Sequence, residues 1–120
     1  MPLLLVMAGG ALGAGARFLV GRAMGAQAFP VTTLIVNIAG GLLMGLLAGT
    51  LARSPASEGW RLFLATGVLG GFTTFSAFSL DLVTLAERGQ FVAAGGYLAA
   101  SVIGSVAALI AGLALVRAAA

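Results

Sequence analysis

The chain has 120 residues, of which 61% are hydrophobic and only 8% charged, and its formal net charge is +3. Soluble domains carry about 25% charged residues, so this composition excludes a soluble globular fold and indicates an integral membrane protein. The sequence has no cysteine and no histidine, which excludes a disulfide framework, a thiolate metal site and a histidine proton shuttle. All the cationic residues are arginines spread along the chain, so no basic run is present that would bind nucleic acid.

Four apolar stretches are long enough to cross a bilayer, which takes about 20 residues in a helix. They cover residues 3–24, 31–51, 62–85 and 91–116, with short connectors between them. We therefore expect an all-α membrane protein with four transmembrane helices, folded as one domain over residues 1–120. The 19 glycines fit this expectation, because small residues let the backbones of membrane helices approach closely.

The first predicted helix carries Arg17, about two turns before its C-terminal end. A long cationic side chain at this depth can extend to the membrane surface, which is a purely structural interpretation. It can also face an aqueous vestibule and attract an anion there. The position of Arg17 alone does not decide between the two.

The second predicted helix carries Asn37, with Thr33 one turn before it on the same face. An amide side chain that faces lipid is costly, so we expect Asn37 to face the protein interior or a wet cavity. A hydrogen bond between helices that serves only their packing is the alternative interpretation.

The third predicted helix contains the run GVLGGFTTFSAFSLD, in which Gly70 and Gly71 precede several hydroxyl side chains. Glycine weakens a helix, and threonine and serine side chains can satisfy the backbone groups that a break releases. We therefore expect this helix to be broken in the middle of the membrane, where the backbone is buried or lines a cavity. Carbonyl oxygens released there, paired across a two-fold axis, would form a small oxygen cage suited to a hard monovalent cation.

The same run places Phe75 and Phe78 three residues apart, on one helix face. A phenyl ring is negative on its face and positive at its edge, so ring edges turned toward a pore can hold a small anion weakly. Packing in a core is the alternative interpretation, but here the rings flank hydroxyl groups at the expected break.

The fourth predicted helix carries Tyr97, Ser101 and Ser105 at intervals of four residues. This spacing aligns their hydroxyl groups in one stripe on one helix face. Each serine can instead bond the carbonyl one turn back, which is the structural alternative.

The arginines give almost no orientation bias. With both chain ends on one side of the membrane, the two surfaces carry nearly equal sets: Arg53, Arg61 and Arg117 on one side, Arg22 and Arg88, with Arg17 nearby, on the other. Orientation normally follows an excess of positive charge on the cytoplasmic side. We therefore predict dual topology, and from it an antiparallel homodimer with its two-fold axis in the membrane plane.

Four features of the chain, in order, resemble the Fluc (CrcB) family of small membrane fluoride channels. They are GGALGAGARF, FPVTTLIVNIAGG, GGFTTFSAF and the spacing of Tyr97, Ser101 and Ser105. The resemblance covers essentially the whole chain, and GGFTTFS is its specific part. One departure is Ala77, which stands where the family commonly has a threonine and so removes one hydroxyl near the expected break.

The resemblance implies an antiparallel, dual-topology homodimer in the cell (inner) membrane, a lipid bilayer, with two fluoride pores. It implies an ion path lined by Asn37, Thr33, Tyr97, Ser101 and Ser105, with Ser76 close by. It implies an aromatic box made of Phe75 and Phe78, one ring from each subunit in each pore, and places Arg17 toward the vestibule. It also implies a central sodium ion (Na+) held by the backbone carbonyls of Gly70 and Thr73 from both subunits.

Three functions remain to be compared. A passive, fluoride-selective channel that lets cytoplasmic fluoride leave down its gradient accounts for Asn37 and for the hydroxyl stripe, although the choice of fluoride comes from the resemblance. A small proton-coupled multidrug exporter of dual topology needs a carboxylate inside the membrane, for which Asp81 is the only candidate. A non-transporting scaffold leaves the stripe unexplained. An enzyme is not expected, because the sequence offers no pair of carboxylates and no nucleophile beside a base.

Overall fold

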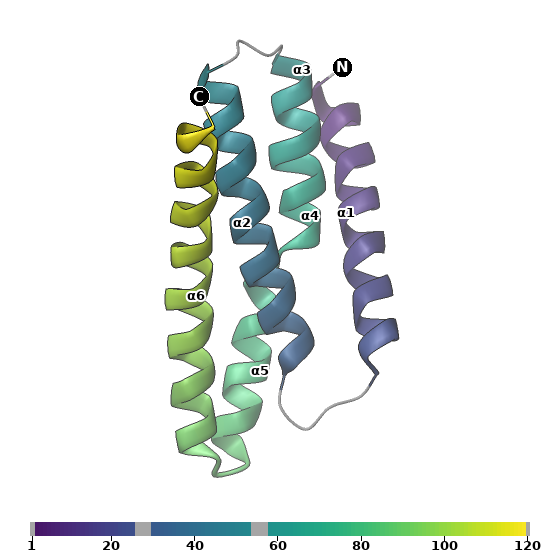
Figure 1. The fold of residues 1–120 in the computed structure, drawn as a ribbon. Coiled ribbons are helices and arrows are strands. Elements are labelled where there is room, and N and C mark those ends of the chain that lie inside the picture. The colour runs from purple at the N-terminus through teal and green to yellow at the C-terminus, as the bar shows by residue number, and fades with distance from the viewer. Residues whose placement is uncertain (1, 26–29, 54–57, 120) are drawn as a thin grey trace.

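The computed structural model describes residues 2–25, 30–53 and 58–119. In these residues the chain is helical, and its long helices lie side by side in a bundle with both chain ends at the same end (Figure 1). The elements are α1 (Pro2–Met24), α2 (Val31–Arg53), α3 (Glu58–Arg61), the π-helix η1 (Leu62–Leu69), α4 (Gly70–Phe72), α5 (Ser76–Glu87) and α6 (Phe91–Ala118). Within the described part of the chain, four helical spans are long and apolar enough to cross a membrane, as the sequence predicts: Pro2–Met24, Val31–Arg53, Glu58–Glu87 and Phe91–Ala118.

The third span is broken between α4 and α5. Thr73 leaves the helical conformation with φ −86° and ψ 158°, and the helix resumes at Ser76. The predicted break is therefore present. The start of the same span differs from the expected α-helix, because Leu62–Leu69 forms a π-helix. The Gly70 N–H accordingly bonds the Ala65 carbonyl, five residues back, which is the bond of a wider turn.

Glycines let the helices pack backbone to backbone in two pairs. In the pair of α2 and α6, a Cβ atom at Gly112 would lie 2.5 Å from the Leu42 carbonyl oxygen. In the pair of α1 and η1, a Cβ atom at Gly67 would lie 2.9 Å from Cα of Gly9. Real Cβ atoms do not approach so closely, so only glycine fits at these crossings. The third span contacts both pairs, because α4, before the break, packs on α1, and α5, after the break, packs on α6.

The Gly112→Ala variant is expected to lower the stability of the protein in detergent by about 1–3 kcal/mol, because the added methyl group overpacks the crossing with α2. Gly95→Ala is the matched control, since it lies in the same helix and a Cβ atom there would have no neighbour within 4 Å. Thermal unfolding followed by circular dichroism measures both. Equal midpoints for the two variants would show that the crossing tolerates a side chain.

Candidate functional site

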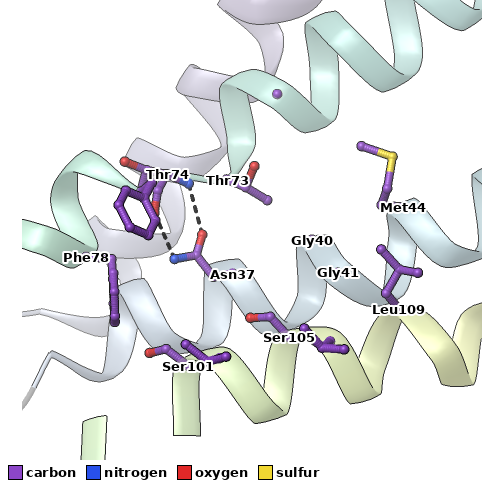
Figure 2. A pocket seen from close by; sticks show the side chains of 14 residues that line it. Asn37, Gly40, Gly41, Met44, Thr73, Thr74, Phe78, Ser101, Ser105 and Leu109 are labelled. Carbon is purple, nitrogen blue, oxygen red and sulfur yellow. Dashed lines mark hydrogen bonds between the residues drawn. The ribbon is translucent and has the colours of Figure 1, made fainter. Parts of the chain in front are cut away.

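A groove of about 610 Å³ lies between α2, the broken segment and α6 (Figure 2). Its polar lining comes from all three parts of the chain: Asn37 of α2, Thr73 and Thr74 of the break, and Ser101 and Ser105 of α6. Its other end is apolar, and Met44 of α2 and Leu109 of α6 both lie at that end in Figure 2. The groove therefore joins the polar stripe of α6 to the break in the third span.

Asn37 holds the broken segment through a two-point hydrogen bond. Its Nδ2 donates to the Thr74 carbonyl oxygen, and its Oδ1 accepts from the Thr74 N–H, both at 2.9 Å (Figure 2). The Nδ2 group carries two hydrogens, so one donor of the amide is left over. The Asn37 side chain thus faces the protein interior, and its partner is the backbone of the break.

These bonds release two backbone carbonyls at the break. In a continuous helix the Thr74 N–H would bond the Gly70 carbonyl, and the Ala77 N–H would bond the Thr73 carbonyl. Here the Thr74 N–H donates to Asn37 Oδ1 at 2.9 Å, and the Ala77 N–H donates to Thr74 Oγ1 at 3.1 Å. The Gly70 and Thr73 carbonyls therefore lose their helical donors, and both residues line the groove. Free carbonyl oxygens are ligands that fit a hard monovalent cation such as sodium.

An aromatic series runs from the groove into the α5–α6 contact. The Phe75 ring is 77% exposed, and its centroid lies 5.5 Å from that of Phe78. Phe78 is buried and its centroid lies 5.1 Å from that of Tyr97, which is fully buried. The Tyr97 hydroxyl donates to Asp81 Oδ2 at 3.1 Å. Phe75 is thus the open end of a series whose other members are fixed inside the protein.

Among the described residues, Ser101 is the buried polar side chain that lacks a partner. It is only 6% exposed, and its Oγ has no hydrogen-bond partner among the residues that the structure describes. It shares one wall of the groove with Ser105, across from Thr73 and Thr74 (Figure 2). Buried hydroxyl groups are normally hydrogen-bonded, so an unpaired one that lines a groove indicates a ligand with hydrogen-bond acceptor character or a water.

The family described as CrcB-like protein, Camphor Resistance (CrcB), has a sequence model that matches residues 4–113. The chain belongs to the CrcB family. This confirms the resemblance that its motifs indicate.

Curated relatives of this CrcB chain carry the name fluoride-specific ion channel FluC. The protein of that name from Sphingopyxis alaskensis is 58% identical over 116 residues, which is 93% of this chain and 92% of the relative. The one from Chelativorans sp. is 57% identical over 120 residues, 96% of this chain and 95% of the relative. FluC 2 of Nitrobacter hamburgensis is 52% identical over 122 residues, 98% of both chains.

Several residues of the expected ion path lie outside the groove lining of this CrcB chain. Thr33 and Tyr97 are absent from the lining, and the Tyr97 hydroxyl is engaged by Asp81 inside the helix contact. Ser76 begins α5, with its Oγ 3.2 Å from Thr74 Oγ1. Arg17 is half-buried on α1, which packs on the π-helix side of the bundle. The groove therefore brings together Asn37, Phe75, Phe78, Ser101, Ser105, Gly70 and Thr73 from the sequence-derived set.

Thr74 is a polar residue of the groove lining that the sequence analysis does not assign to the site. It takes part in four interactions at the break, with Asn37 twice, with Ala77 and with Ser76. A signal for it exists in the sequence, because a threonine three residues before a helical N–H is a preferred helix cap. The sequence predicts that the third helix, residues 62–85, is broken, but it does not say at which residue the second helix starts.

Proposed function

We propose that this CrcB chain forms a fluoride-selective channel, which lets fluoride leave the cytoplasm passively down its gradient and so protects the cell from fluoride toxicity. Support comes from relatives at 52–58% identity that are named fluoride-specific ion channels. The geometric observation that carries the proposal is the buried Ser101 hydroxyl, which lines the groove without a partner. A row of uncharged hydrogen-bond donors is best suited to bind a small anion.

The groove offers an anion donors without a fixed positive charge. These are the Ser101 and Ser105 hydroxyls, the spare Nδ2 hydrogen of Asn37, and the ring edges of Phe75 and Phe78. Such donors replace part of the hydration shell of the ion, and conduction requires that they release it again. Neutral donors suit that second requirement better than arginine, whose full charge would hold the anion tightly.

We propose further that the channel is an antiparallel homodimer of dual topology in the inner membrane. The groove and the 77% exposed Phe75 ring lie at an open side of the single chain, where a second copy would complete the ion path. Arginines also end helices at both ends of the bundle, Arg22 in α1 and Arg53 in α2. C-terminal reporter fusions test the topology, and one orientation for nearly all molecules would contradict it.

A structural sodium ion at the dimer axis completes this proposal, with the Gly70 and Thr73 carbonyls of both subunits as its ligands. The released state of these two carbonyls supports it, because their helical donors are bonded elsewhere. Dimer dissociation measured in sodium and in an equal concentration of choline tests the ion. Identical dissociation in both would count against a sodium ligand set.

Ion efflux from liposomes tests the function directly. The purified protein is reconstituted, valinomycin carries the countercharge, and fluoride and chloride electrodes record release in parallel. Rapid fluoride release without chloride release is expected. Release of neither ion from a well-folded protein would contradict the channel.

The Ser101→Ala variant is expected to lower fluoride efflux without lowering stability. The variant removes a donor from the groove, and it also removes an unpaired buried hydroxyl, whose burial costs about 1–3 kcal/mol. Ser79→Ala is the matched control, because its Oγ bonds the Phe75 carbonyl at 2.9 Å and Ser79 lies outside the groove lining. Efflux and thermal unfolding are measured on both. Parental efflux from Ser101→Ala would remove Ser101 from the ion path.

The exporter alternative is not supported. Its candidate carboxylate, Asp81, accepts the hydrogen bond of the buried Tyr97 hydroxyl, and Asp81 is not among the described residues that line the groove. The relatives carry the name of a fluoride channel. Drug-driven proton release from the purified protein is the measurement that would restore the exporter.

A further inference from the structure

The two consecutive threonines of the break have different hydrogen bonds. The Thr73 hydroxyl donates to the Leu69 carbonyl at 2.9 Å, one turn back, so it closes the helix that ends there. The Thr74 hydroxyl accepts the Ala77 N–H at 3.1 Å, so it caps the helix that starts next. Thr73 therefore belongs to the upstream helix and Thr74 to the downstream one.

The Thr74 cap competes with the Thr73 carbonyl for one donor. The first N–H groups of a helix have no partner inside the helix and must find an acceptor. For the Ala77 N–H, the acceptor of a continuing helix would be the Thr73 carbonyl. Because the Thr74 hydroxyl takes this donor, α5 does not extend backward to Thr73.

The conformation of Thr74 also fixes Phe75, the next residue. Both backbone groups of Thr74 are held by Asn37, each at 2.9 Å, and its hydroxyl is held by Ala77. Phe75 keeps its ring 77% exposed at the groove only while the chain leaves the break in this direction. Phe75 itself already has helical angles, φ −93° and ψ −30°, so extension of α5 through Thr73 would change the angle between α4 and α5 and thereby move the ring relative to the groove.

We propose that the Thr74 hydroxyl is a positioning group that keeps the third span broken, and so keeps the Thr73 carbonyl released and Phe75 directed at the groove. The inference rests on the proposed channel function for its effect on flux. Its effect on the backbone does not depend on that function. Thr74→Val removes the hydroxyl with little change in shape, and Thr74→Ser retains it.

The test compares Thr74→Val, Thr74→Ser and Thr50→Val in liposome efflux. Thr50 is the matched control, because its hydroxyl donates to the Leu46 carbonyl at 2.8 Å and it lies away from the groove lining. We expect fluoride efflux about tenfold lower in Thr74→Val, since small misplacements of a site residue have effects of this size or larger. Thr74→Ser and Thr50→Val are expected to stay within about twofold of the parent.

NMR of the protein with 13C-carbonyl threonine supplies the readout that flux alone lacks. In Thr74→Val the Thr73 carbonyl resonance is expected to move toward its helical position, and in Thr74→Ser to stay in place. A parental resonance and parental efflux in Thr74→Val, or equal impairment of the serine variant, would overturn the proposal. If Thr74→Val does not elute as a single species, Thr74→Ala carries the same comparison. If the parent itself releases no fluoride, the channel function fails, while the carbonyl resonance still decides the role of Thr74.

Discussion

Asn37→Asp is expected to lower fluoride efflux by at least about a hundredfold. The aspartate oxygen that replaces Nδ2 cannot donate to the Thr74 carbonyl, so two acceptors would face each other at the present 2.9 Å contact. The new charge also repels the anion by about 4 kcal/mol at about 4 Å and an effective dielectric constant of about 20. Each 1.4 kcal/mol, roughly, corresponds to a tenfold change in rate. Electrode-recorded efflux from liposomes measures the loss.

Gln90→Glu is the control for that substitution. It makes the same change from amide to carboxylate at an exposed residue before α6, outside the groove lining. We expect parental efflux from it, because a charge in contact with water is strongly screened. Parental efflux from Asn37→Asp as well would exclude Asn37 from the ion path and leave it as a packing residue.

The sequence predicts that the third span is broken but not where the break lies. The glycine pair and the hydroxyl groups predict that the third span is interrupted, and it is. The interruption lies after Phe72, however, and Gly70 and Gly71 are helical. A Cβ atom at Gly71 would lie 2.5 Å from the Gly10 carbonyl oxygen, so this glycine serves the contact with α1. The break itself depends on hydrogen bonds that take helical donors away.

Those hydrogen bonds are tertiary, which is why the sequence does not reveal them. We expect Asn37 to face the interior because exposing its amide to lipid would be costly. Its partner Thr74 cannot be predicted in the same way, since it lies 37 positions further along the chain. The stripe of Tyr97 and Ser101 follows from spacing alone. The packing of α5 on α6 makes these two residues different. The Tyr97 hydroxyl bonds Asp81, whereas the Ser101 hydroxyl has no partner among the described residues. The π-helix likewise has no local pattern that distinguishes it from an α-helix.

The aromatic ring at the open side of the groove leads to the second large expected effect. Phe75→Ile is expected to lower fluoride efflux by at least about tenfold while the protein elutes as the parent does. Isoleucine keeps an apolar side chain of similar reach, so the contact area with a second copy in the proposed dimer would change little. It lacks the ring quadrupole, whose positive edge is the feature that attracts an anion without a formal charge.

Phe91→Ile is the control for that substitution. It removes an exposed phenylalanine ring elsewhere in the chain, so it distinguishes a general effect of losing a ring from the specific effect of losing the Phe75 ring. Phe91 begins α6, is 70% exposed and lies outside the groove lining, so it matches Phe75 in residue type and exposure. Parental efflux is expected from it. If Phe75→Ile also keeps parental efflux, the ring edges take no part in conduction, and the donors of the path reduce to hydroxyl and amide groups. A loss in Phe75→Ile alone shows that the exposed aromatic ring at the groove serves the ion, since a branched aliphatic side chain would pack equally well there.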